Sequence, residues 1–258
     1  MILGSVDSVW RYPVKSMRGE EMEEAFVGFP GIYGDRLYAF RSSGAPEGFP
    51  YFTGRDRREM IRFRPRFRHP EVAARPVNLA QAQANNAAPL SGSPEQLSIE
   101  IETPDGQFLA VDDPRLTELL LDGQTHSLSL LRSERALVDA RPVSLFSIQT
   151  AKQLGDESGM AVDKRRFRAN LYLDLPNTAP FGEEEYIGCS LRIGSTVVVS
   201  ILGRDSRCMM VTLDPDTAEK SPTVLKAIAQ NHGGNAGLYA AVLVEGMARR
   251  GDPVELIE

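Results

Sequence analysis

Alternating hydrophobic and polar positions predict short strands along most of this chain. Residues 97–103 alternate strictly, turn at Pro104-Asp105-Gly106 and alternate again to Val111, which predicts a hairpin with one buried face. Segments of the same strand character lie at residues 6–12, 36–40, 171–175, 190–193, 196–202 and 238–244. Because strands outnumber helices and follow each other closely, the pattern favours a mainly β fold with some α (α+β), built on a β-barrel, over a doubly wound sheet.

Three helices are predicted from their end signals. Asp113 can cap a helix that has Pro114 in its first position, a second helix begins at Ser147 and ends at Gly155, and a third runs from Pro222 towards His232. The polar stretch 81–94 predicts an exposed loop. We expect one domain boundary near residue 120, which gives domains at 1–120 and 121–258.

Composition restricts the class of partner and the compartment. The 258 residues are 42% hydrophobic and carry a net charge of -6, which argues against a nucleic acid as the main partner. No apolar run approaches the roughly 20 residues that span a bilayer, and the first residues lack the features of a signal peptide. Two cysteines cannot form a disulfide framework for a chain of this length, so we expect free thiols in a cytoplasmic protein.

The familiar catalytic motifs are absent from the sequence. It contains no Walker loop, no G-x-S-x-G, no H-E-x-x-H and no C-x-x-C, and its three histidines are isolated from one another. The usual phosphate-loop, hydrolase and zinc interpretations therefore lose their sequence support.

A cysteine late in the chain is the leading candidate for metal chemistry. Cys208 follows Ser206 and Arg207 directly after a valine-rich segment that predicts a strand. Its thiolate would suit a soft metal, and the neighbouring arginine would help to lower the thiol pKa. The alternative is that Cys208 is a small buried residue with no chemical role, as free cysteines commonly are.

Two basic segments are candidate anion sites. Strand alternation in the run that enters the segment at Leu171 would place Arg166, Arg168 and Asn170 on one face, where they suit a planar, phosphorylated ligand. The alternative is that the arginines of this segment form ion pairs with Asp163, Asp174 or the acids Glu183 to Glu185. Near the N-terminus, Lys15-Ser16 offers a point charge beside a hydroxyl at a strand end.

Taken in order, these pieces resemble the MOSC family, named for the C-terminal part of molybdenum cofactor sulfurase, with its usual N-terminal β-barrel partner. The resemblance is carried by Tyr12-Pro-Val-Lys-Ser16, Gly34-Asp-Arg36, Thr53-Gly-Arg55, Arg166-Phe-Arg-Ala-Asn170, Phe181-Gly-Glu-Glu-Glu185, Ile193-Gly194, Arg207-Cys208, Asp214-Pro-Asp-Thr217 and Gly251-Asp252. It implies a MOSC-type β-barrel plus an N-terminal β-barrel-like domain. The sequence departs from the family pattern at Met17, where many relatives have cysteine, and at Ala218, where glycine is usual.

The resemblance implies a molybdenum cofactor, a metal bound to molybdopterin, held through Cys208 as the metal ligand and catalytic residue. The residues implied to hold the pterin and its phosphate are Lys15, Arg36, Arg168 and Asn170. Those that would line the site are Ser16, Ser206 and Arg207. At the start of the predicted second helix, Ser147 and Thr150 are further phosphate candidates, because the N-terminus of a helix attracts anions.

The resemblance also implies a reaction. The leading hypothesis is an oxidoreductase that reduces small N-hydroxylated or related N-oxygenated substrates. Because the chain has no four-cysteine cluster, its electrons would come from a separate iron–sulfur or flavin protein. One alternative is a carrier that holds sulfur or the cofactor on Cys208 without turning over a substrate, and another is a redox-silent binding module. Pyridoxal phosphate accompanies the full-length sulfurase, but no local lysine context supports it here.

Overall fold

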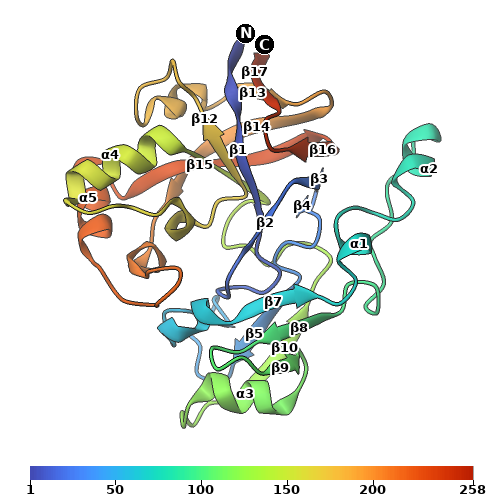
Figure 1. Ribbon diagram of the computed structural model, residues 1–258, viewed down its shortest axis with the longest axis vertical. Coiled ribbons are helices and arrows are strands. Elements are labelled where there is room, and N and C mark those ends of the chain that lie inside the picture. The colour runs from blue at the N-terminus through green and yellow to red at the C-terminus, as the bar shows by residue number, and fades with distance from the viewer. Residues whose placement is uncertain (258) are drawn as a thin grey trace. The chain divides into compact units, whose positions relative to one another are not determined.

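A closed barrel of seven strands forms the core of one of the two compact units of the chain (Figure 1). The computed structural model describes residues 1–257. The strand order is β12-β11-β15-β14-β13-β17-β1, and pairing of β12 with β1 closes the barrel. The bounds of these strands are β1 Ile2–Arg11, β11 Val143–Ser147, β12 Leu171–Asp174, β13 Ser190–Ile193, β14 Val197–Ser206, β15 Asn235–Val244 and β17 Pro253–Ile257. The prediction of a mainly β, α+β fold with a barrel is confirmed.

The barrel interior follows directly from the alternation in the sequence. Leu191 and Ile193 of β13 are buried and pair in register with the buried Val199 and Val197 of β14. The residues between them point outward, as the period of two requires. Burial of these branched side chains against the other strands makes one continuous hydrophobic core.

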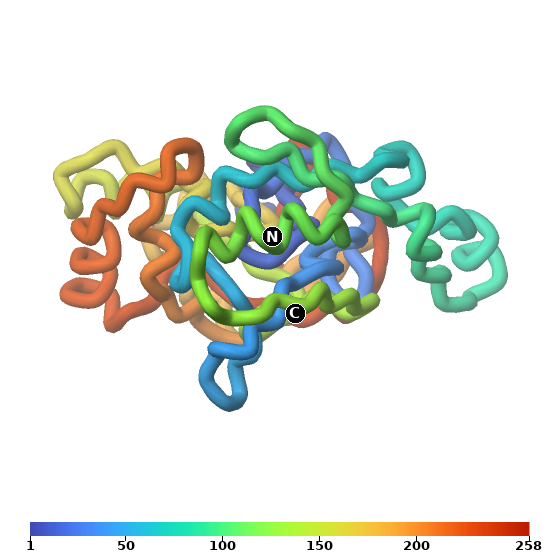
Figure 2. Tube along the Cα trace, turned by 90° about the horizontal axis from the view of Figure 1, so that it is seen from below, coloured from blue at the N-terminus to red at the C-terminus, as the bar shows by residue number. Residues whose placement is uncertain are grey.

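Two helices accompany the barrel strands. α4 (Ile148–Ser158) connects β11 to β12, which run parallel, and it begins where the Ser147 hydroxyl accepts a hydrogen bond from the Thr150 N–H at 3.3 Å. α5 (Thr223–Asn231) lies beside α4 (Figures 1 and 2). The predicted end of α4 at Gly155 is three residues too early, because Gly159 with φ 69° is the residue that ends the helix.

The N-terminal strand belongs to this same unit. β1 lies between β12 and β17, and its last residues, 9–11, pair with β2 (Glu20–Met22). A small sheet, β16-β3-β4, is formed by β3 (Glu24–Gly28), β4 (Gly31–Ile32) and β16 (Gly246–Arg249). The unit therefore comprises residues 1–11 and 20–32 together with the chain from Val138 onward. The two compact units alternate along the sequence, and the domain assignment at 1–120 and 121–258 stays a prediction.

The second unit contains residues 12–19 and 33–137, which form two three-stranded sheets and a hydrophobic core of their own. The first sheet, β10-β5-β6, consists of β5 (Tyr38–Ser42), β6 (Tyr51–Phe52) and β10 (Leu128–Arg132); the second, β7-β8-β9, consists of β7 (Arg64–Phe67), β8 (Ile99–Glu102) and β9 (Phe108–Ala110). The helices are η1 (Arg58–Arg62), α1 (Pro70–Ala73), α2 (Leu79–Ala84) and α3 (Pro114–Leu121).

Two sequence predictions for this unit are confirmed, and one needs correction. The hairpin is β8 and β9, and Asp113 caps α3 by accepting a hydrogen bond from the Arg115 N–H at 2.9 Å. The loop predicted over 81–94 is wrong in its first residues, where the alanine-rich α2 extends to Ala84. Within residues 1–257, no helix is both long enough and apolar enough to cross a membrane.

Candidate functional site

Cys208 lies just beyond the end of a barrel strand, as the sequence predicts. β14 ends at Ser206, and Cys208 is the residue before the short helix η4 (Met209–Thr212). Its side chain is a free, partly exposed thiol, and Cys189 is also free and partly exposed. We call residues 207–217, which include η4, the cysteine loop. Cys208 can therefore offer its sulfur to a ligand from a segment that the barrel holds in place.

The basic segment that precedes β12 is a helical turn instead of a strand. η2 (Lys164–Phe167) begins where the Asp163 carboxylate accepts a hydrogen bond from the Arg165 N–H at 2.8 Å, and it ends at Arg168 with φ 54°. We call residues 163–168 the arginine turn. The predicted alternation, with Arg166, Arg168 and Asn170 on one face, is wrong because the capped turn replaces the period of two. Arg166 is buried, whereas Arg168 is partly exposed.

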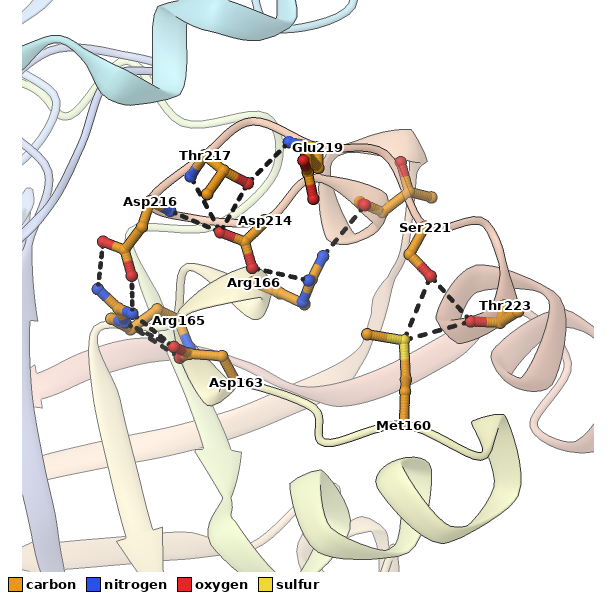
Figure 3. Close-up of polar contacts among 11 residues, drawn as sticks. Met160, Asp163, Arg165, Arg166, Asp214, Asp216, Thr217, Glu219, Ser221 and Thr223 are labelled. Atoms are coloured by element: carbon orange, nitrogen blue, oxygen red, sulfur yellow. Dashed lines mark hydrogen bonds and ion pairs between the residues drawn. The ribbon is translucent and has the colours of Figure 1, made fainter. Parts of the chain in front are cut away.

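Two arginine side chains join the arginine turn to the C-terminal half of the cysteine loop (Figure 3). Arg166 donates from Nη1 to the Thr212 carbonyl and from Nη2 to Asp214 Oδ2, both at 3.1 Å. Arg165 Nη2 lies 2.6 Å from Asp216 Oδ2 and 2.6 Å from Asp163 Oδ2. The hydrogen bonds that Arg165 donates to the carboxylates of Asp163 and Asp216 raise its pKa, so its charge is permanent. The alternative that the arginines form ion pairs is thus realised for Arg165 with Asp163, whereas Arg166 pairs with Asp214, which the prediction did not include.

Asp214 organises the end of the cysteine loop. Its Oδ1 accepts hydrogen bonds from the backbone N–H groups of Asp216 and Thr217, both at 3.0 Å (Figure 3). Burial alone would raise the pKa of Asp214, but these hydrogen bonds and the Arg166 charge outweigh it, and the pKa is lowered. Asp214 therefore stays ionised and fixes the turn that follows η4.

Arg207 joins the other end of the cysteine loop to the arginine turn. Its Nη1 donates to the Phe167 carbonyl at 2.8 Å, and its Nε donates to the Ala236 carbonyl at 2.6 Å. Ser206 is exposed, and its hydroxyl donates to Asn235 Oδ1 at 3.0 Å. Cys208 and Arg168 are consequently carried by two segments that are bonded to each other on both sides of the cysteine.

The other polar candidates in this unit are engaged in bonds within the chain. Asn170 is 1% exposed, accepts hydrogen bonds from the Ser144 N–H and hydroxyl, and donates to the Trp10 carbonyl. Ser147 caps α4, and the Thr150 hydroxyl donates to the buried carboxylate of Glu183 at 2.8 Å. Burial raises the pKa of Glu183. The negative charge at the start of α4, where a phosphate was predicted, is thus the carboxylate of Glu183.

The second unit brings Lys15 and Arg36 together through one peptide segment. Lys15 Nζ donates to the Leu137 carbonyl at 2.7 Å, and the Leu137 N–H donates to the Arg36 carbonyl at 2.9 Å. Lys15 Nζ also lies 4.6 Å from the centre of the Tyr51 ring. Ser16 and Arg36 have φ values of 64° and 47°, in the left-handed region that non-glycine residues seldom adopt. Lys15, Ser16 and Arg36 form one local group in this unit.

Sequence reasoning missed the acids that hold the site in place. Asp205 is 4% exposed and pairs with Arg207, and Glu183 is 2% exposed. Asp205 could have been found from the sequence, because the alternation of β14 places it at an inward position where an apolar residue is expected. Within residues 1–257, no group of three or more histidine, cysteine, aspartate or glutamate residues is arranged to hold a metal ion.

Comparison with known proteins identifies part of the chain. The MOSC domain profile matches residues 132–255. The molybdenum cofactor sulfurase of Drosophila grimshawi is 29% identical over 133 residues, which cover 49% of this chain and 17% of that protein. That of Drosophila mojavensis is 29% identical over 146 residues, which cover 56% of this chain and 18% of that protein. The aligned part of this chain thus spans less than a fifth of the length of these curated relatives.

Two solved structures resemble this chain with low TM-scores. YuaD of Bacillus subtilis is 13% identical, with a TM-score of 0.49, over 98% of this chain and 94% of that chain. YiiM of Geobacillus stearothermophilus is 22% identical, with a TM-score of 0.36, over 46% of this chain and 55% of that chain. On the sequence match, residues 132–255 of this chain are a MOSC domain, homologous to molybdenum cofactor sulfurase.

Proposed function

We propose that this protein binds the molybdenum cofactor through Cys208 and reduces small N-hydroxylated or related N-oxygenated substrates. The observation that supports it most directly is the partly exposed thiol of Cys208, on a loop bonded at both ends to the turn that ends at Arg168. The homology of the MOSC domain to molybdenum cofactor sulfurase supports an association with this cofactor.

The donor set of the first unit fits such a cofactor. A thiolate is a soft ligand that suits molybdenum, and Arg168, a partly exposed residue with a cationic side chain, suits the negative charge of a phosphate. The left-handed backbone of Arg168, with φ 54°, is the kind of strain found where a side chain is held for binding. When bound, the cofactor would supply the two-electron chemistry that removes oxygen from the substrate.

The residues of this chain would bind and orient the group. Cys208 would be the metal ligand, and Arg168 an anchor for the phosphate. Lys15, Ser16 and Arg36 of the second unit are proposed as further anchors, on the basis of their cationic and hydroxyl groups. For Asn170, Ser147 and Thr150, the hydrogen bonds within the chain favour a role in holding the backbone of the site.

The electron source and compartment are part of the same proposal. Reduction of an N-hydroxyl group to an amine consumes two electrons and two protons and releases water. We propose that a separate iron–sulfur or flavin protein delivers the electrons, and that the reaction takes place in the cytoplasm. Two free cysteines, both partly exposed, are in keeping with a reducing compartment.

A carrier function is the second candidate, and the sulfurase relatives favour it. In that case Cys208 would hold sulfur or the cofactor for delivery to another protein, without turning over a small substrate. Both candidates use the same thiol. They differ in whether the protein with its cofactor reduces a substrate through many cycles.

Metal and pterin analysis of protein made in cells that synthesise the cofactor tests the proposal. We expect about one molybdenum and one pterin per chain in the wild type and in Cys189→Ala, and loss of molybdenum in Cys208→Ala. With a chemical electron donor, wild type and Cys189→Ala should reduce benzamidoxime to benzamidine, and Cys208→Ala should not. A wild type that carries a persulfide on Cys208 and no pterin would favour the carrier. Full reductase activity in Cys208→Ala would refute the ligand assignment.

A further inference from the structure

The guanidinium of Arg207, the residue next to Cys208, is directed into the protein. The side chains of Arg207 and Asp205 are each 6% exposed, and Nη2 lies 2.8 Å from Asp205 Oδ2, a close ion pair without the angle of a directed hydrogen bond. The remaining two nitrogens donate to the carbonyls of Ala236 and Phe167. All three guanidinium nitrogens therefore face acceptors within the chain.

The space around this guanidinium is matched to its flat shape. Phe146 and Phe167 stack with ring centres 3.9 Å apart, and Arg207 Cζ lies 5.5 Å and 5.4 Å from those centres. At Gly237, with φ 82°, a Cβ atom would lie 2.7 Å from the Phe146 ring and 3.0 Å from Arg207 Nη2. Glycine is thus required where β15 passes the guanidinium.

The charge of Arg207 is balanced where it lies. Asp205 provides one negative charge, and the Tyr239 hydroxyl donates a hydrogen bond to that carboxylate. Burial, followed by the charge of Asp205, raises the pKa of Tyr239, so Tyr239 remains a neutral donor. A buried, neutralised ion pair projects little field towards solvent, so Arg207 has little charge to offer an anion outside.

We propose that Arg207 is a positioning residue, which holds Cys208 and Arg168 in a fixed relation and does not itself contact the phosphate of a cofactor. Its Nη1 binds the carbonyl of Phe167, the residue before Arg168, and its backbone N–H donates to the Gly234 carbonyl at 2.8 Å. The backbone that leads into Cys208 is thereby tied to the residue before β15 and to the arginine turn. The family resemblance implies a lining role for Arg207 in the cofactor site, and this proposal replaces it.

The inference rests on the proposed function only in its use of Cys208 as the ligand, so its test uses metal-free protein. A Cys189→Ser background leaves Cys208 as the single thiol. The rate of alkylation is measured with neutral iodoacetamide and with anionic iodoacetate. The ratio of the two rates reports positive charge facing the thiol, whereas a change common to both rates reports the position and mobility of the loop.

We expect Arg207→Lys to change both rates by about threefold or more with little change in their ratio, because an ammonium cannot span the three acceptors. The double variant Asp205→Leu with Arg207→Met removes both charges, and its ratio should stay within about twofold of the parent. Arg204→Met is the matched control, since Arg204 is an exposed arginine of β14, three residues before Arg207, and its side chain pairs with Glu184. It should leave both rates unchanged.

Two results would overturn the proposal. Rates in Arg207→Lys equal to those of the parent would mean that Arg207 does not hold Cys208 in position. A ratio that falls by about threefold or more in the double variant would mean that the guanidinium charge reaches the thiol, as expected for an anion contact. Arg207→Lys keeps the charge and remains informative if the double variant does not fold. The alkylation rates are measured on metal-free protein, so they do not depend on whether Cys208→Ala keeps or loses the cofactor. The positioning role of Arg207 and the ligand role of Cys208 are therefore tested separately.

Discussion

Replacing Asp214 with alanine is expected to destabilise the protein by about 2 to 3 kcal/mol, because it leaves the cation of Arg166 buried without its anionic partner. Arg166 has a side chain that is 4% exposed, and it would keep only its bond to the Thr212 carbonyl. The turn at Asp216 and Thr217 would lose its acceptor as well.

The magnitude follows from the exposure of the two partners. Removing one member of a fully buried pair costs about 3 to 5 kcal/mol, and the Asp214 side chain is 32% exposed, so solvent screening lowers the estimate. Asp216→Ala is the matched control, because its partner Arg165 keeps Asp163 and the Asp216 side chain is 47% exposed. Asp216→Ala should lower the free energy of unfolding by less than about 1 kcal/mol.

Urea denaturation followed by circular dichroism measures both free energies of unfolding. A cost for Asp214→Ala below about 1 kcal/mol, or equal to that of Asp216→Ala, would refute the view that Asp214 holds the cysteine loop. The pKa of Asp214 is lowered in the folded state, so its stabilisation is present above the unfolded value near 3.8 and is lost as the pH falls through the folded value. Asp214→Asn should therefore reduce the acid sensitivity of the wild type.

Two further substitutions test the packing around the site. Gly237→Ala should lower the free energy of unfolding by about 2 kcal/mol or more, because its Cβ would meet the Phe146 ring. Gly251 has a similar positive φ but open space around it, so Gly251→Ala should lower the free energy of unfolding by about 1 kcal/mol. Equal losses for the two variants in urea denaturation would contradict this. Burial raises the pKa of Glu183 above 4.5, so the wild type loses stability as the pH rises through the folded value, and Glu183→Gln, which can still accept from Thr150, should remove that loss. Melting curves of the two proteins that stay parallel from pH 4 to 8 would contradict it.

Local patterns in the sequence were sufficient to predict many of the elements. Strict alternation predicted the β8–β9 hairpin, strand character predicted β13, and Asp113 and Ser147 marked the starts of two helices. The pairing of β1 between β12 and β17 joins residues far apart along the chain, and no local period contains that information. For that reason the start of the chain was not predicted to complete the barrel.

The candidate site was predictable in its residue types and less so in its contacts. The sequence located Cys208 after a strand, but it represented the segment before Leu171 as a strand, since a capped turn of four residues has no periodicity of its own. The inward direction of the Arg207 side chain depends on Asp205, Phe167 and Ala236, which come together only in the folded barrel. The family resemblance therefore implied a lining role for Arg207, whereas the fold places its side chain in a buried ion pair.

X-ray absorption at the molybdenum edge tests the central claim, that Cys208 is the protein ligand to the metal. The comparison is between wild type and Cys208→Ser, both loaded with the cofactor, with Cys189→Ser as the control for general thiol loss. We expect that molybdenum in Cys208→Ser has one sulfur neighbour fewer than in the wild type, and that Cys189→Ser keeps the wild-type number. An unchanged sulfur shell in Cys208→Ser would contradict it.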